Sequence, residues 1–392
     1  MRIALYGGTF NPPHMGHILA ARSALRELCP DRLLMMPTAV PPHKEREKGS
    51  PPDTERLRLL ELLTGGEEKV EVSDIELRRG GLSYTADTVG ELTKLYPEAE
   101  LFVLMGTDML ESFEKWYEFR YILDNAALAV FSRDGGEREK IERLAESLKT
   151  RFGARVKVIP HEPLAVSSTE LRELLRCRCG TEFLNGAAYA HIIKMRLYDA
   201  RPDLEWLREQ VRPYLKASRQ AHVDGCRDEA IRLARRWGCD EEKAAEAAIL
   251  HDITKKCSRD EQLLLCNKYA IMTDDAEIEN EKLLHAKTGA AIARHEFGVP
   301  DEIYSAILWH TTGREGMTLL EQIIYIADYI EPTRDFDGVG ELRRIAYEQL
   351  DAAMELGLKM SIEDLQARGI EPHTVSARAL SWFSDRKERF FK

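Results

Sequence analysis

The first half of this 392-residue chain alternates between short apolar runs and longer amphipathic stretches. Each apolar run has the length of a β-strand, and each stretch between them can hold a helix that crosses back over a sheet. This order is typical of an α/β fold: a parallel sheet with helices on both faces. The six strands are expected in RIALYG (2–7), RLLMMPT (32–38), VEVSD (70–74), LFVLMG (101–106), ALAVFSR (127–133) and RVKVIP (155–160).

The pattern changes at about residue 198, where LYDARPD (197–203) has the proline and charges of a linker or helix boundary. Beyond it, helical periodicity dominates, as in LLEQIIYIADYI (319–330). The sequence therefore predicts a Rossmann-like α/β domain over 1–197, followed by an all-helical domain over 198–392.

Composition narrows the class of protein. The formal net charge of −11 argues against bulk binding to nucleic acid or to an acidic membrane surface. No apolar run approaches the roughly 18 residues of a membrane span, and Met1 leads into a strand without a signal-peptide pattern. Seven scattered cysteines favour reduced thiols in the cytoplasm, and the spacing of Cys177 and Cys179 is not that of a zinc site. A homo-oligomer remains open.

One dense motif, GGTFNPPHMGH, spans residues 7–17. Gly7 and Gly8 would let the backbone approach a ligand closely, and a helix beginning near His14 would aim its free N–H groups at the same loop. His14 and His17 would share one face of its first turn, where imidazolium stabilises charge on a phosphoryl group. The alternative is a glycine turn with two surface histidines.

A second motif, VSSTELR (166–172), follows the last expected strand. Ser168 or Thr169 could cap a helix, and Arg172 lies one turn further on. Hydroxyls, free N–H groups and a guanidinium at a helix start favour a second phosphate contact. The alternative is a simple cap with a solvated arginine.

Together these motifs resemble the HxGH nucleotidyltransferase superfamily. Five further segments stand in order, and with them the first half resembles bacterial nicotinate mononucleotide adenylyltransferases. They are PPHK (41–44), SYTADT (83–88), MGTDML (105–110), KWYEF (115–119) and FSRDG (131–135).

The resemblance implies transfer of AMP from ATP to nicotinate mononucleotide with Mg²⁺, giving deamido-NAD and pyrophosphate in NAD biosynthesis. Such enzymes act by positioning and charge stabilisation. It implies catalytic roles for His14, His17 and Arg172. It implies ATP binding by Gly7, Gly8, Thr9, Phe10, His14, His17, Gly106, Asp108, Arg133, Ser167, Ser168, Thr169 and Arg172. It implies binding of nicotinate mononucleotide by Lys44, Thr85, Trp116 and Tyr117, with Trp116 stacking on the ring; for Trp116 the alternative is a half-buried core aromatic. An acceptor such as phosphopantetheine is a second possibility, which SYTADT and KWYEF argue against.

The helical half contains an ordered set of histidines and aspartates. Asp328 lies in a strongly apolar helical run, where an unpaired carboxylate would be costly and a metal ion would serve as partner. Nitrogen and carboxylate ligands from separate helices suit iron, manganese or similar ions in a bundle core. Singly, each histidine is better explained as a structural residue. The set resembles the two-metal HD phosphohydrolase superfamily in His222, His251, Asp252, His285, His310 and Asp328.

The segments RQAH (219–222), HDITK (251–255), LLHAKTGA (283–290) and WHTTGREGMTLLEQIIYIADYIEPTR (309–334) narrow this resemblance to bacterial HD hydrolases that split diadenosine tetraphosphate into two ADP. It implies two divalent metals, iron or manganese, with Asp252 bridging them and acting in catalysis with Lys255. It implies polyphosphate binding by Lys255, Thr311, Thr312 and Arg314. Two alternatives remain: another nucleotide substrate, such as a deoxynucleoside triphosphate or an alarmone, or a non-catalytic sensor or dimerisation module.

Overall fold

The computed structural model describes residues 1–42, 49–132, 135–279 and 281–390, and the chain folds into two compact units, Met1–Arg201 and Pro202–Lys392. The expected domain boundary at 197/198 falls within a short 3₁₀ helix, η3 (Leu197–Asp199), which belongs to the first unit. Among the described residues, no helix is both long and apolar enough to cross a membrane.

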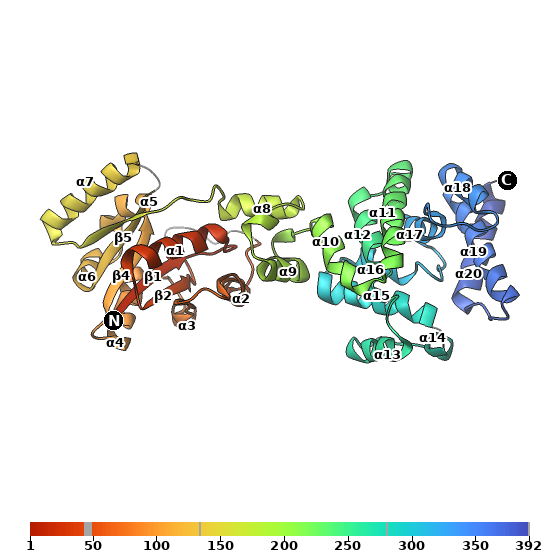
Figure 1. The fold of residues 1–392 in the computed structure, drawn as a ribbon, viewed down its shortest axis with the longest axis horizontal. Helices are drawn as coiled ribbons and strands as arrows, with labels where there is room; N and C mark the ends of the chain where they lie inside the picture. The colour runs from red at the N-terminus through yellow and green to blue at the C-terminus, as the bar shows by residue number, and fades with distance from the viewer. Residues whose placement is uncertain (43–48, 133–134, 280, 391–392) are drawn as a thin grey trace. The chain divides into compact units, whose positions relative to one another are not determined.

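A six-stranded parallel sheet forms the centre of the first unit (Figure 1). Each of the six apolar runs contributes one strand, so the predicted fold class is confirmed. The strand order is β3-β2-β1-β4-β5-β6. The strands are β1 (Arg2–Gly8), β2 (Arg32–Pro37), β3 (Val70–Val72), β4 (Glu100–Gly106), β5 (Ala126–Ser132) and β6 (Val156–Pro160).

Successive residues of β1 are buried, and successive side chains of a strand point to opposite faces, so both faces of the sheet are buried at this strand. Ile3 and Leu5 of β1 belong to a core that includes apolar side chains from α4, α6 and α7. Ala4, between them, is fully buried as well. The helices of this unit are α1 (Met15–Leu28), α2 (Asp53–Thr64), α3 (Ile75–Arg79), α4 (Thr85–Leu95), α5 (Thr107–Glu111), α6 (Phe119–Asn125), α7 (Gly135–Phe152), α8 (Ser168–Arg176) and α9 (Gly186–Met195), with 3₁₀ turns η1 (Phe113–Lys115) and η2 (Thr181–Phe183).

The strand order reverses between β1 and β4. From β1 the chain proceeds outward through β2 and β3, then returns to β4 on the other side and continues to β6. In open α/β sheets, ligands bind beyond the carboxyl ends of the strands at such a reversal. Gly8 ends β1 and Gly106 ends β4, so both glycines border this position.

The second unit is entirely helical over its described residues, as expected. A single apolar core joins α11, α12, α15, α16, α17 and α19. Its helices are α10 (Leu204–Val211), α11 (Ala217–Trp237), α12 (Glu241–Leu250), α13 (Arg259–Lys268), α14 (Asp275–Glu279), α15 (Glu281–Phe297), α16 (Asp301–Leu308), α17 (Leu319–Ile330), α18 (Val339–Glu348), α19 (Leu350–Ala367) and α20 (Thr374–Phe390), with a 3₁₀ turn η4 (Arg212–Tyr214).

Candidate active sites

The two histidines of GGTFNPPHMGH lie together at the start of α1. His14 is the N-cap residue, and its ring centroid lies 3.9 Å from that of His17. The backbone N–H of His14 donates to Nδ1 of His17 at 3.1 Å. Because Nδ1 accepts this bond, the proton of a neutral His17 lies on Nε2, which leaves a donor free for a ligand.

Gly16 lets the His14 ring lie close to the helix. A Cβ at Gly16 would come 2.9 Å from Cε1 and Nδ1 of His14, nearer than real Cβ atoms approach. The glycine between the two histidines therefore has a steric role. His14 Nδ1 is buried and has no hydrogen-bond partner among the described residues.

Burial sets the charge of this pair. It lowers the pKa of His14 to about 4 and, as the largest cause, the pKa of His17 to about 3. Both rings are therefore neutral near pH 7 in the ligand-free protein. The sequence analysis expected charged imidazolium rings. Because burial lowers both pKa values, these rings would become charged near pH 7 only with an anionic phosphate bound beside them.

The second motif contacts the first directly. Ser168 Oγ donates to the carbonyl of Pro12 at 2.9 Å, and Arg172 Nη1 donates to the carbonyl of Asn11 at 2.6 Å. Arg172 also donates to Thr169 Oγ1 at 3.0 Å. The N-cap of α8 is Ser167, with Glu170 completing a capping box, and not Ser168 or Thr169 as proposed from the sequence.

One cavity of about 350 Å³ is lined by six of the expected binding residues, three from the end of β1 and the loop after it and three from the expected nicotinate side. Gly7, Gly8 and Thr9 line it on one side. Thr85, the first residue of α4, and Trp116 line it as well, together with the half-exposed Tyr117. Trp116 also packs on Phe113 of the core at 5.3 Å between centroids, so it is both a half-buried core aromatic and part of the cavity wall.

The remaining expected residues of this unit divide into two groups. Phe10 is buried, with its ring 5.0 Å from that of His17 and its backbone at a positive φ of 46°. Gly106 is the N-cap of α5, and Asp108 lies in the first turn of that helix, beside the strand reversal. Lys44 and Arg133 lie outside the described residues.

The structure adds two residues to this site that the motifs did not suggest. Buried Arg56 donates to the carbonyls of Thr9 and Thr38, both at 2.6 Å, and so holds the loop after β1. Glu76 lines the cavity and accepts a hydrogen bond from Thr88 at 2.7 Å. Burial raises the pKa of Glu76.

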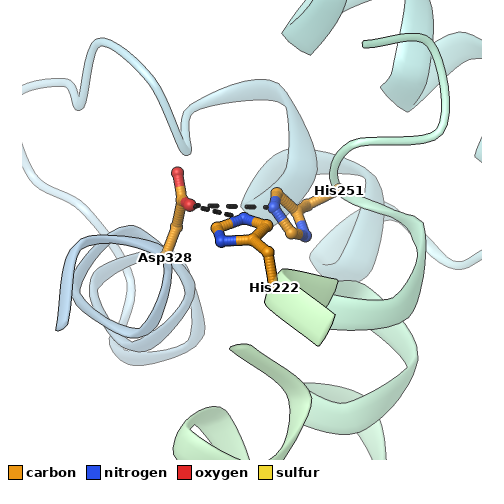
Figure 2. Close-up of side chains that lie close together, drawn as sticks. All are labelled: His222, His251 and Asp328. Carbon is orange, nitrogen blue, oxygen red and sulfur yellow. Dashed lines mark ion pairs between the residues drawn. The ribbon is translucent and has the colours of Figure 1, made fainter. Parts of the chain in front are cut away.

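In the second unit, the six expected metal ligands come together from five segments. His222 lies on α11, His251 and Asp252 follow α12, and the others come from α15, the turn after α16, and α17. Figure 2 shows three of them, with Asp328 facing both His222 and His251. Its Oδ1 lies 3.1 Å from Nε2 of His222 and 3.9 Å from Nε2 of His251.

Asp252 stands at the centre and divides four histidines into two pairs. Its Oδ2 lies 3.7 Å from Nε2 of His222 and 3.6 Å from Nε2 of His251. Its Oδ1 lies 3.2 Å from Nε2 of His285 and 3.8 Å from Nε2 of His310. Each carboxylate oxygen thus faces a different pair of imidazoles.

The donor set fits divalent metal ions. Two groups in this cluster have ligand atoms within 4.8 Å of one another: His222, His251 and Asp328; and His251, Asp252 and His310. Nε2 of His222, Nε2 of His251 and Oδ1 of Asp252 are buried without a hydrogen-bond partner among the described residues. Such atoms are costly unless something coordinates them.

The protonation states of the cluster also favour metal binding. Burial lowers the pKa of His251 to about 4 and that of His285 to about 3, so both offer lone pairs at neutral pH. Burial opposes ionisation of Asp252 and Asp328, yet the neighbouring histidines and cations hold the pKa of both carboxyls well below the usual range. Neutral imidazoles and ionised carboxylates are the forms that bind metal.

Three cations border the ligands. Lys255 Nζ lies 2.9 Å from Nε2 of His285 and 3.6 Å from Oδ1 of Asp252. Arg219 pairs with Oδ2 of Asp252, and Arg334 donates to Oδ1 of Asp328 at 2.6 Å. Asp328 therefore has protein partners in addition to the metal ion that the sequence analysis expected. The sequence motifs did not suggest roles for Arg219 or Arg334, because neither is a metal-ligand type. The contact of Arg219 with Asp252 joins residues 33 positions apart, whereas Arg334 lies only six positions from Asp328.

Unlike these three cations, the residues after His310 that were expected to bind polyphosphate make no hydrogen bond or ion pair with the proposed metal ligands among the residues that the structure describes. Arg314 donates to the fully buried Glu321 at 2.9 Å and to the carbonyl of Glu315. Thr312 Oγ1 donates to the carbonyl of Gly313, while Thr311 Oγ1 is buried without a partner among the described residues. In the described part of the chain, no hydrogen bond or ion pair joins Arg314 to the six ligands.

A third group of potential ligands is occupied by the protein itself. Asp274 and Glu277 cap the start of α14 by exchanging hydrogen bonds. His373 lies 3.1 Å from Asp274, and Lys287 pairs with Glu277 at 2.6 Å. These contacts explain the group without an ion.

Comparison with known proteins divides the chain in the same way. The cytidylyltransferase-like family model matches residues 5–174, and the HD-domain model matches residues 221–333. A probable nicotinate-nucleotide adenylyltransferase of Carboxydothermus hydrogenoformans is 32% identical over 198 residues, 50% of this chain and 94% of that protein. A symmetrical bis(5'-nucleosyl)-tetraphosphatase of Bacillus subtilis is 43% identical over 152 residues, 38% of this chain and 80% of that protein.

Among solved structures, a protein of Clostridium acetobutylicum described as a predicted HD superfamily hydrolase involved in NAD metabolism is 36% identical. Its TM-score is 0.45, and the match covers 46% of this chain and 97% of that one. Each of the two sequence relatives is matched over most of its own length. The chain therefore belongs to two families: that of the nicotinate-nucleotide adenylyltransferases in its N-terminal part, and that of the HD-type symmetrical bis(5'-nucleosyl)-tetraphosphatases in its C-terminal part.

Proposed function

We propose that the chain is a bifunctional enzyme of nucleotide metabolism. Its first unit transfers AMP from ATP to nicotinate mononucleotide, giving deamido-NAD and pyrophosphate. Its second unit hydrolyses diadenosine tetraphosphate symmetrically to two ADP. The observation that carries the double assignment is the presence, in one chain, of a cavity bordered by the GGTF loop and a separate cluster of six metal-ligand side chains.

In the first unit, a phosphate oxygen of nicotinate mononucleotide attacks the α-phosphorus of ATP, and the bond from that phosphorus to the β-phosphate oxygen breaks. Pyrophosphate leaves. His17 Nε2–H and the start of α1 stabilise the charge that accumulates on the phosphates, with His14 beside them. Mg²⁺ bound to the triphosphate would screen its charge.

The loop contacts support a joint role for the two motifs. Ser168 and Arg172 hold the carbonyls of Pro12 and Asn11, directly before the histidines. Positioning of the reactants is the main source of rate in this kind of transfer. On the acceptor side, Thr85, Trp116 and Tyr117 would bind the nicotinate ring, and Gly106 and Asp108 the ribose of ATP.

In the second unit, two divalent cations would be held by the pairs that Asp252 separates, one with His222, His251 and Asp328 and the other with His285 and His310. When bound, such ions make a water molecule acidic and withdraw charge from phosphate oxygens. The mixture of imidazole and carboxylate suits iron or manganese.

The protein's own cations then act on the substrate. Arg219, Lys255 and Arg334 would bind the polyphosphate and orient its central bridge toward the carboxylates. Water adds to one central phosphorus, the bridge to the other central phosphorus breaks, and two ADP leave. Thr311 and Thr312 would contact the outer phosphates.

Substrate comparison tests the proposal on the full chain. Nicotinate mononucleotide should be the preferred adenylyl acceptor over nicotinamide mononucleotide and phosphopantetheine, and diadenosine tetraphosphate should be cut to ADP alone. A chain that binds metal but hydrolyses none of the nucleotides supplied would favour the sensor alternative. All seven cysteines are free, which fits a reducing compartment, and we place both reactions in the cytoplasm.

A further inference from the structure

His222 lies between two carboxylates, one at each ring nitrogen. Its Nδ1 lies 2.9 Å from Oε1 of Glu331, and its Nε2 lies 3.1 Å from Oδ1 of Asp328. Asp328 is one of the six ligands, whereas Glu331 belongs to no ligand group of the cluster among the described residues. Glu331 lies one turn after Asp328, at the end of α17.

Glu331 is the more firmly held of the two carboxylates. Its side chain has no exposed surface, whereas that of Asp328 is 16% exposed. The backbone N–H of Thr333 donates to Oε2 at 2.7 Å, and its hydroxyl donates to Oε1 at 2.5 Å. Arg343 of α18 donates to the carbonyls of Ile330, Glu331 and Arg334, which fixes the whole turn.

This arrangement determines which nitrogen of His222 can bind a metal. A neutral imidazole has one N–H, and a ring nitrogen that donates to a carboxylate leaves the other nitrogen with a lone pair. In the tautomer that donates from Nδ1 to Glu331, the lone pair of Nε2 would face Asp328 and Asp252. Nε2 has no hydrogen-bond partner among the described residues.

Gly225 provides the space for Glu331. It lies on α11, three residues after His222. A Cβ there would come 2.7 Å from Oε2 of Glu331 and 3.3 Å from Cδ of Pro332. Because Thr333 holds the carboxylate and the turn is clamped, the side chain cannot swing aside without losing its bond to His222.

We propose that Glu331 is a positioning residue that fixes the ring orientation and tautomer of His222 for metal binding, and that Gly225 is required for its approach. A carboxylate behind a ligating histidine raises the basicity of the ring, and its loss weakens metal binding by about 10- to 100-fold. This inference rests on the proposed function of the second unit as a metal-dependent hydrolase. The experiment that tests it measures metal binding and needs no substrate.

The test is a double-mutant cycle on the chelator-treated full chain, with Mn²⁺ affinity and stoichiometry measured by calorimetry. Glu331→Gln keeps the size and one acceptor oxygen but lacks the charge. We expect it to weaken the tighter Mn²⁺ site by about 10-fold or more. In a His222→Gln background the same change should have an effect of less than about 3-fold, because the ring through which Glu331 acts is gone.

Two results would overturn the proposal: unchanged Mn²⁺ affinity in Glu331→Gln, or an equal loss in both backgrounds, which would indicate a general structural role. Circular dichroism and thermal unfolding of the metal-free variants exclude misfolding as the cause. A wild-type chain that binds Mn²⁺ but does not hydrolyse diadenosine tetraphosphate would contradict the proposed function alone. A wild-type chain that binds no Mn²⁺ would contradict both.

Gly225→Ala gives an independent check. It should weaken Mn²⁺ binding in the same direction as Glu331→Gln, although alanine ordinarily favours a helix over glycine. Gly340→Ala, on α18, is the matched control, since a Cβ there meets nothing within 4 Å. Equal Mn²⁺ affinities of the two alanine variants would contradict the steric role of Gly225.

Discussion

Arg334 donates to Asp328 through Nη2 at 2.6 Å, on the same carboxylate oxygen that faces Nε2 of His222. The guanidinium of Arg334 therefore contacts the carboxylate oxygen of Asp328 that is expected to bind a metal ion. Its positive charge stabilises the ligand-free carboxylate and opposes the arrival of a cation, yet it is suited to a polyphosphate.

Arg334→Gln therefore separates metal binding from catalysis. We expect Mn²⁺ affinity to stay the same or rise, because a like charge is removed from the site. The kcat/KM for diadenosine tetraphosphate should fall by about 10- to 100-fold, mainly through KM, as a charge-assisted phosphate contact is lost. Steady-state kinetics at saturating Mn²⁺ measure this; parallel losses of metal and activity would contradict it.

Metal content should depend on Asp252. Its two oxygens face separate histidine pairs, so we expect about two equivalents of metal per wild-type chain. Asp252→Ala should lose most of this metal and essentially all hydrolysis. Plasma mass spectrometry measures the metal content. An adenylyltransferase assay of the same sample is the control for a folded chain. Full metal content in the variant would refute the ligand assignment.

The two activities should be separable by mutation. His17→Ala removes the Nε2 donor at the start of α1 and should lower adenylyl transfer by at least about 10³-fold. Hydrolysis of diadenosine tetraphosphate should be unaffected, because the six proposed ligands of the second site all lie in the second unit. Product assays on one preparation compare both rates, and a common loss would reveal coupling or misfolding.

Gly16→Ala should act through His14. The new Cβ would lie 2.9 Å from the ring, which must move, and small displacements of this kind cost about 10²-fold in rate. Gly186→Ala on α9 is the control, because a Cβ there meets nothing within 4 Å. Adenylyltransferase kinetics distinguish them; equal rates for the two variants would show that the close approach of Gly16 is not needed.

Acid should destabilise the first unit through His14. The pKa of the folded residue is about 4, lowered by burial from the usual 6.5, so below pH 6.5 the unfolded chain takes up a proton that the folded protein does not. The free energy of unfolding therefore decreases as the pH falls from 6.5 toward 4. At pH 5 the decrease should be about 2 kcal/mol. Hydrogen exchange of β1 and β4 in wild type and His14→Asn measures the difference. Identical pH dependence in both would contradict the assignment.

The sequence predicted the elements better than the contacts. All six strands and the helical second unit follow from local periodicity, and the proposed metal ligands, such as His222 and Asp328, follow from the resemblance of ordered motifs. Arg56, Glu76, Arg219 and Glu331 were missed for a common physical reason. Their roles arise from tertiary contacts, and the bond from His222 to Glu331 joins residues 109 positions apart. Neither spacing nor residue type reveals such a partner.

The placement of Asp252 has an evolutionary consequence. With two equivalent oxygens, one side chain serves two pairs of imidazoles. Replacing a single oxygen by an amide nitrogen, as in asparagine, would leave one pair with an oxygen ligand and face the other with N–H donors. The two proposed metal positions would then no longer share a carboxylate, while the surrounding arginines and lysine would stay in place. We expect that this one substitution would convert a hydrolase of this design into a protein that binds a nucleotide and releases it uncleaved.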